Sequence, residues 1–154
     1  MPSRNRIFND DEIEIIINKF NHRLFRQFCE FAYNTGARSG EIRQLSKDNI
    51  HSSNILVNGK TGTRTIKLNK RAKELLGNYD YTRSYISHQF KSQARLYGIK
   101  NARFHDLRRT FGYKLIKKGM SIYQVSKLLG HKSVITTENH YAPLLVNDIK
   151  DFTL

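Results

Sequence analysis

Six side chains in this sequence have the chemistry needed to act on a phosphodiester. They are Arg38, Lys60, His105, Arg108, His131 and Tyr141. An arginine fork can hold two phosphate oxygens, a lysine or histidine can move a proton, and a phenol can attack phosphorus. His105 and Arg108 are three residues apart, so a helix would place them on one face. The set predicts a site that handles phosphate.

Each of these residues also has an ordinary structural interpretation. Arg38 could form a salt bridge with Glu41, three residues further on. Lys60 could be a solvated hairpin lysine, and His131 could cap a helix end. Tyr141 is one of eight tyrosines in the chain. Taken one at a time, the six residues therefore carry little functional information.

The charge of the chain favours a polyanionic partner. The 154 residues fit one compact domain, and 27 Lys and Arg against 13 Asp and Glu give a net charge of +14. Asp106 is the sole acid between Arg83 and Lys118, a stretch rich in basic residues. Nucleic acid is the partner that this charge favours, although a solubilising surface or a ribosome-associated protein would share it.

Several classes of site are disfavoured by what the sequence lacks. A single cysteine, Cys29, excludes an internal disulfide and a thiolate metal cluster, and it lies in an apolar run that predicts burial. The six histidines lack carboxylates at metal-binding spacing, and Gly59 to Gly62 lacks P-loop spacing. We therefore expect no metal and no cofactor. The first residues lack a signal-like apolar segment, so we expect an intracellular, cytoplasmic protein.

The pattern of apolar residues and caps predicts a mainly α fold (α+β) with one small antiparallel sheet. The expected sheet pairs Ile55–Val57 with Thr63–Leu68, with Asn58-Gly59 as the turn signal and Lys60 near the connection. Helices are expected around 9–20, 21–34, 39–45, 69–77, 82–97, 105–118, 121–129 and from 133 through Tyr141. In the second helix, Leu24 belongs to the predicted apolar face. Pro143 predicts a bend after Tyr141.

One segment supports a different function. Ser121 with Gln124 forms a capping-box pattern, and Gly130 separates that helix from the one expected to carry Tyr141. The segment therefore resembles a helix-turn-helix, which would make the chain a non-catalytic DNA-binding regulator.

The order of the motifs is more specific than any one of them. Along the chain come TGARSGEI at 35–42, GKTG at 59–62, HDLRRTF at 105–111, LLGH at 128–131, and TTE at 136–138 followed by Tyr141. This succession resembles the catalytic domain of tyrosine recombinases, the phage integrase family, from about Asp10 to Pro143. The resemblance implies a helical recombinase domain that cleaves and rejoins DNA site-specifically through a covalent 3′-phosphotyrosyl intermediate, without metal or ATP.

The resemblance also implies a role for each candidate residue. Arg38 and Arg108 would clamp the scissile phosphate, and Lys60 would protonate the leaving 5′-oxygen. His105 would assist proton transfer at the nucleophile, Tyr141. His131 would hydrogen-bond the phosphate, and Glu41 would orient the catalytic arginine.

The sequence departs from the family pattern in two places. His131 and Tyr141 are separated by one residue more than in many relatives, and His140 directly precedes the tyrosine. The N-terminal domain that closes many relatives around DNA would have no room before Arg38. We therefore expect residues 1–154 to form a single catalytic domain, without that core-binding domain in this chain. Such a chain would be either a catalytic fragment of a longer recombinase or a reduced protein that relies on a partner.

The resemblance implies double-stranded DNA as the partner and no membrane. It further implies a monomer in isolation, a tetramer on DNA, accessory DNA-bending proteins and nucleoid association in action. The apolar segment after Pro143 could dock on a neighbouring protomer or fold back in cis. Within enzymes, the alternative is a type IB topoisomerase that relaxes DNA.

Overall fold

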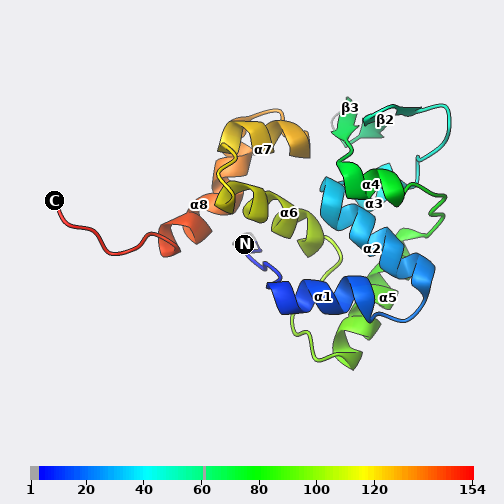
Figure 1. Ribbon diagram of the computed structural model, residues 1–154, viewed down its shortest axis with the longest axis horizontal. Helices are drawn as coiled ribbons and strands as arrows, with labels where there is room; N and C mark the ends of the chain where they lie inside the picture. The colour runs from blue at the N-terminus through cyan, green and yellow to red at the C-terminus, as the bar shows by residue number, and fades with distance from the viewer. Residues whose placement is uncertain (1–3, 61) are drawn as a thin grey trace.

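The computed structural model describes residues 4–60 and 62–154, with eight helices and three strands among them. Figure 1 shows a helical body with a small sheet at one side and a C-terminal segment that projects from the other. The elements are α1 (Asp10–Asn18), α2 (Arg23–Thr35), α3 (Ser39–Ile42), β1 (Ile50–His51), β2 (Asn54–Gly59), β3 (Gly62–Lys67), α4 (Lys70–Glu74), α5 (Arg83–Leu96), α6 (Asp106–Lys117), α7 (Ile122–Leu129) and α8 (Val134–Asn147). The mainly helical prediction is confirmed.

Local capping chemistry sets most helix boundaries. Asn9 and Glu12 form a reciprocal capping box at the start of α1, as Ser121 and Gln124 do at the start of α7. Gly36 ends α2 in the left-handed conformation at φ 68°, where a residue with a Cβ would be strained. Leu24, however, is 47% exposed, so its predicted place on the buried face of α2 is wrong.

The sheet is antiparallel, in the order β1-β2-β3, and its tight connection is shifted from the predicted position. Asn58 and Gly59 belong to β2 and pair with Thr63 and Gly62. The turn signal at Asn58-Gly59 was therefore wrong, because these residues extend the ladder instead of reversing the chain. Lys60 lies at the connection as expected, and Thr61 lies outside the described residues.

Two apolar clusters meet at α6. The larger cluster contains the aromatic side chains between α1, α2 and α5, including Phe28, which stacks on Phe104 with ring centroids 4.9 Å apart. The smaller cluster consists of Val125, Leu129 and Tyr141, between α7 and α8. Because α6 packs against both α2 and α7, it fixes the sheet side of the molecule relative to the tyrosine side.

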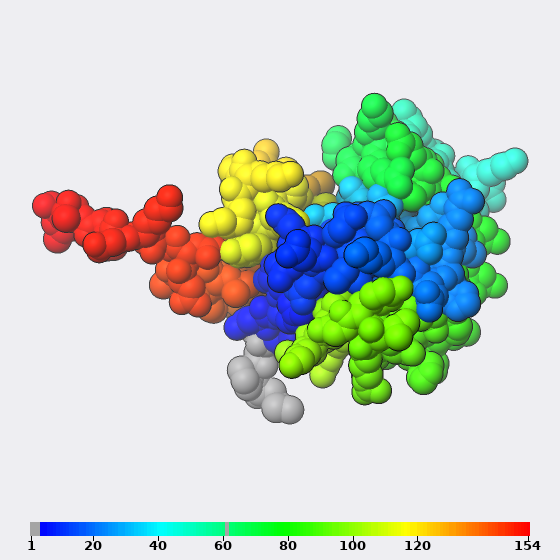
Figure 2. Space-filling model, turned by 60° about the horizontal axis from the view of Figure 1, so that its bottom comes forward, coloured from blue at the N-terminus to red at the C-terminus, as the bar shows by residue number. Residues whose placement is uncertain are grey.

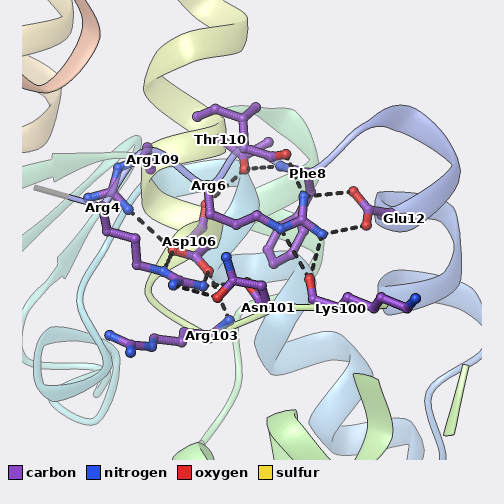
Figure 3. Close-up of polar contacts among 11 residues, drawn as sticks. Arg4, Arg6, Phe8, Glu12, Lys100, Asn101, Arg103, Asp106, Arg109 and Thr110 are labelled. Carbon is purple, nitrogen blue, oxygen red and sulfur yellow. Dashed lines mark hydrogen bonds and ion pairs between the residues drawn. The ribbon is translucent and has the colours of Figure 1, made fainter. Parts of the chain in front are cut away.

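A buried carboxylate anchors the start of α6. Asp106 is fully buried and accepts hydrogen bonds from Arg4 Nε at 2.8 Å and Arg4 Nη2 at 2.7 Å (Figure 3). It also accepts from the Arg103 backbone N–H at 2.8 Å and from Arg109 Nη1 at 3.2 Å. The N-terminal segment thereby crosses the first turn of α6, and the Phe8 N–H donates to a hydroxyl of the same helix.

The bend predicted at Pro143 does not end the last helix. α8 continues through Pro143 to Asn147, since Leu144 and Leu145 still pack against the smaller apolar cluster. Beyond α8 the chain projects away from the body, with Phe152 exposed (Figures 1 and 2). The first part of the tail is therefore docked in cis, and Asp148, directly after α8, still contacts Tyr113 and Lys117 of α6.

Cys29 is a buried free thiol, as its apolar surroundings predicted. Burial raises the pKa of this thiol well above its ordinary value, so it is held in the neutral form. Among the described residues, none of the helices has the length and apolarity to cross a bilayer.

We expect Asp106→Asn to destabilise the domain by about 3 kcal/mol, because it removes the buried carboxylate that pairs with the partly buried Arg4 and Arg109. The matched control is Asp10→Asn, which removes an exposed ion pair with Lys114 and should change stability little. Urea unfolding of both variants measures the difference. Equal stability of the two variants would contradict the anchoring role of Asp106.

Candidate active site

Three of the six candidate residues line one open hollow of about 970 Å³. Arg38 immediately precedes α3, Lys60 lies at the β2–β3 connection, and His105 immediately precedes α6. Loops and helix starts from three separate parts of the chain therefore converge on the hollow. Further basic residues from α5 and the segment before α6 continue its wall: Arg83, Lys91 and Arg103.

Arg108 does not line this hollow, unlike His105. Its side chain is only 5% exposed, and it donates from Nη1 to the Gly36 carbonyl at 2.7 Å and from Nη2 to the Leu129 carbonyl at 2.6 Å. Burial, with the charges of Arg38 and Arg64, lowers its pKa to about 9, so it remains a cation at neutral pH. Arg108 thus joins the end of α2 to the end of α7.

Glu41 is the carboxylate nearest these cations, but its main partner is not Arg38. Glu41 Oε2 and Oε1 accept from Arg64 Nε at 2.6 Å and Nη2 at 2.9 Å. The Arg38 guanidinium is 3.9 Å away, while the Arg38 backbone N–H donates to Glu41 Oε1 at 2.8 Å. Burial raises the pKa of Glu41, but hydrogen bonds from Arg64 and Arg38 outweigh it and hold the pKa below its ordinary value.

The two candidate histidines are neutral at physiological pH. Loss of hydration, followed by the charges of Arg108 and Arg38, lowers the pKa of His105 to about 4. The pKa of His131 is also lowered to about 4, by loss of hydration and then by Arg108. A neutral imidazole keeps one nitrogen able to accept a proton and one able to donate. Either histidine can therefore serve in proton transfer or in hydrogen bonding to an anion.

The ring of His131 is fixed by neighbours on α8. Its Nδ1 lies 2.6 Å from Oγ1 of the fully buried Thr137, and the ring stacks on His140 at 5.6 Å between centroids. Since Nδ1 is engaged by Thr137, Nε2 is the nitrogen left for a ligand. The additional histidine before Tyr141 therefore packs on the site instead of disturbing the helix.

Tyr141 is buried away from the hollow. It is 2% exposed and belongs to the smaller apolar cluster. A Cβ on Gly112 of α6 would lie 2.7 Å from Tyr141 Cζ and closer still to the hydroxyl. Burial raises the pKa of Tyr141 to about 12, although Arg108 and Arg109 oppose the shift. In this conformation the phenol is protonated and covered.

The structure thus brings some of the six predicted residues together and leaves others apart. Arg38, Lys60 and His105 share the hollow, and Arg108 reaches the carbonyl two residues before His131. Tyr141 reaches none of them by a hydrogen bond within the described residues. No cluster of three or more metal-binding side chains occurs in residues 4–60 and 62–154.

Sequence reasoning did not identify Arg64 or Gly112. Arg64 lies on a predicted strand among threonines, and the nearer pair Arg38–Glu41 offered an obvious ion pair. Gly112 lies within a predicted helix, where an isolated glycine costs stability and hints at close packing. That hint does not tell which side chain approaches the glycine.

Known proteins with similar sequences and structures support this fold. Residues 77–147 match the phage integrase family. The tyrosine recombinase XerA of Saccharolobus solfataricus is 28% identical over 160 residues, covering 92% of this chain and 54% of the relative. The chain is therefore similar to the phage integrase family over residues 77–147, and to a tyrosine recombinase over most of its length. It spans about half the length of this curated relative.

Solved structures of recombinases share the fold. The Tn1549 transposon integrase, in complex with a circular intermediate DNA, superposes with a TM-score of 0.75 at 15% identity, covering 96% of this chain and 67% of the other. The catalytic domain of bacteriophage HP1 integrase gives 0.73 at 17% identity, covering 90% and 88%. A crystal structure of XerA recombinase gives 0.71 at 18% identity, covering 99% and 68%.

We expect Gly112→Ala to displace the buried Tyr141. Alanine favours a helix over glycine by about 1 kcal/mol, so in open space the change would stabilise the protein. Here the added methyl group collides with the ring of Tyr141. We expect lower thermal stability and faster nitration of Tyr141, measured by peptide mass spectrometry.

The control is Gly77→Ala, where an added Cβ meets only ordinary contacts with Tyr79. A stabilised Gly112→Ala variant, with Tyr141 nitrated at the wild-type rate, would show that the tyrosine is not held against α6.

Proposed function

We propose that this domain cleaves and rejoins DNA strands at specific sites through a covalent 3′-phosphotyrosyl intermediate. The observation that carries the proposal is the convergence of Arg38, Lys60 and His105 on one basic hollow, with the buried Arg108 on the helix that His105 precedes. The similarity to the phage integrase family and to a tyrosine recombinase supports the same chemistry. Double-stranded DNA is the substrate that fits the net charge of +14 and the basic wall of the hollow.

The proposed reaction is a transesterification. The Tyr141 oxygen attacks phosphorus and gives its proton to neutral His105, while the bond from phosphorus to the 5′-oxygen breaks. Lys60 donates a proton to that leaving oxygen. Arg38 and Arg108 stabilise the charge that develops on the phosphate, and His131 donates from Nε2 to one of its oxygens. Attack by a 5′-hydroxyl reverses each step and rejoins the strand.

The proposal requires Tyr141 to leave its buried position. The hydroxyl now lies over Gly112, and burial holds its pKa at about 12. Movement of α8 toward the hollow would relieve the burial that raises the pKa of the phenol, while the nearby cations, which already oppose that shift, would continue to lower it. Free protein is therefore in a resting state, and DNA binding must supply the free energy for the movement.

The C-terminal tail fits a role in assembly. Leu144 and Leu145 pack in cis, whereas Val146 near the end of α8 and Ile149 and Phe152 beyond it are exposed apolar side chains. We infer a monomer in isolation and a tetramer on DNA in which each tail docks on a neighbour. We further infer that residues 1–154 act as the catalytic domain alongside a second DNA-binding module and accessory DNA-bending proteins, at the nucleoid.

Two other functions remain distinguishable by experiment. A type IB topoisomerase would relax plasmid DNA without site preference. A helix-turn-helix regulator would bind DNA through α7 and α8 and leave no adduct. The shared hollow favours catalysis over the regulator, because binding alone does not need Lys60 and His105 beside Arg38.

A nicked suicide substrate tests the proposal, because loss of the short strand traps the covalent adduct. We expect wild-type protein to form the adduct and Tyr141→Phe to form none while still binding DNA. Tyr123→Phe is the control, since Tyr123 is 61% exposed on the neighbouring helix α7. An adduct formed by Tyr141→Phe would assign the nucleophile to another residue.

The acid role of Lys60 has its own test. A 5′-bridging phosphorothiolate leaves without a proton, so a missing general acid should matter little with that substrate. We expect it to restore cleavage by Lys60→Ala but not by Arg108→Ala, which should lose about a hundred- to thousandfold in rate. Equal failure of both variants on the phosphorothiolate would remove Lys60 from this role.

A further inference from the structure

We propose that Arg64 is a positioning residue that holds the segments carrying Arg38, Lys60 and His131 in one arrangement. The inference rests on the proposed function, since it concerns the geometry needed for strand cleavage. Arg64 lies on β3, and its side chain is 10% exposed. Contacts on three sides of this side chain carry the inference.

The first contact leads to Arg38. The planar Arg64 fork binds both oxygens of Glu41, at 2.6 and 2.9 Å, and Glu41 is only 3% exposed. Glu41 Oε1 also accepts from the Arg38 backbone N–H at 2.8 Å. Arg64 therefore fixes the carboxylate that defines the start of α3, where the Arg38 side chain enters the hollow.

The second contact leads to His131. Arg64 Nη1 donates to the Leu128 carbonyl at 3.0 Å. Gly130 lies so close that an added Cβ would be 2.5 Å from Arg64 Cδ. Gly130 also has φ 73°, which favours glycine. The side chain of Arg64 thus packs against the turn that ends α7 and leads directly into His131.

The third contact leads to Lys60. Gly59 immediately precedes this lysine, and a Cβ on Gly59 would be 3.0 Å from Glu41 Oε2 and 3.4 Å from Arg64 Cδ. The backbone before Lys60 therefore rests on the Glu41–Arg64 pair. The β2–β3 ladder also pairs Val57 with Arg64 itself, two residues before Gly59.

Arginine is the side chain that this junction requires. Its rigid fork satisfies a carboxylate with two bonds and a carbonyl with a third, whereas a lysine ammonium is a single point charge on a flexible stem. Because Nε, Nη1 and Nη2 all have protein partners, Arg64 is engaged before any phosphate arrives. This separates its role from that of Arg38, whose guanidinium lies 3.9 Å from its nearest acidic partner.

The test measures adduct formation by the full chain on a saturating suicide substrate, with phosphate or with a 5′-bridging phosphorothiolate at the cleavage position. We expect Arg64→Lys and Arg64→Ala to cleave the phosphate substrate at least tenfold more slowly than wild type, with DNA affinity within about twofold. Because Lys60 loses its support, the rate ratio of phosphorothiolate to phosphate should rise at least severalfold. A merely structural residue would not change that ratio.

Arg71→Ala is the matched control, because Arg71 also binds a glutamate, Glu30, through two nitrogens but does not line the hollow. The Arg71→Ala variant should keep the wild-type cleavage rate on the phosphate substrate and the wild-type rate ratio of phosphorothiolate to phosphate. If Arg64→Ala does not fold, Arg64→Lys carries the test, with circular dichroism confirming its fold.

Failure of the proposed function and failure of the positioning role of Arg64 give different results. Absence of an adduct with wild-type protein would overturn the proposed function. A wild-type adduct, together with folded Arg64 variants that cleave at the wild-type rate or keep the wild-type ratio, would overturn the positioning role alone.

Discussion

The structure depends on an excess of positive charge held around one buried carboxylate. Glu41 binds Arg64 directly, lies 3.9 Å from the guanidinium of Arg38, and helps to offset the charge of Arg108. Three guanidinium groups therefore share the region of a single acid. Mutual repulsion and burial lower the pKa of Arg108 and of His131 in the free protein. In the proposed function, a bound phosphate would supply negative charge among these cations and would be favoured electrostatically.

The fold holds this charge cluster together by long-range contacts. Arg108 bonds the carbonyls of Gly36 and Leu129, which end α2 and α7, and Asp106 fixes the first turn of the same helix. The two carbonyls pair with two nitrogens of the buried Arg108 without neutralising its charge. The first turn of α6 therefore carries a buried cation in place of an apolar side chain.

The sequence contained the local structure but not the contacts between its elements. Caps at Asn9 and Ser121 and the left-handed end at Gly36 follow from nearest neighbours, and they were predictable. The β2–β3 connection was misplaced, because Asn58-Gly59 is a turn signal that the extended ladder overrides. The motif order indicated a resemblance to the phage integrase family, which no single residue could have done, and the family model matches residues 77–147.

Three features of the site depend on segments far apart in sequence. Arg64 reaches Glu41 across 23 residues. Gly112 accepts the ring of Tyr141 from another helix, and that packing explains why the candidate nucleophile is covered. The pairing of His105 with Arg108 on one helix face was a sound local inference, but Arg108 is directed into the body by α2 and α7. The spacing of residues in the sequence predicts which side chains share a helix face. Which other elements contact that face depends on the tertiary packing.

The pKa of His131 reports most directly on the positive charge around the site. NMR titration can determine this pKa in the free protein and in a complex with duplex DNA. The titration uses the Tyr141→Phe variant, so that the DNA is not cleaved during the measurement. The structure gives a pKa of about 4 in free protein, because hydration is lost and Arg108 lies near. A phosphate among these cations should raise that pKa by about one unit or more. An unchanged pKa in a fully formed DNA complex would contradict the claim that the cation cluster is built to receive a phosphate.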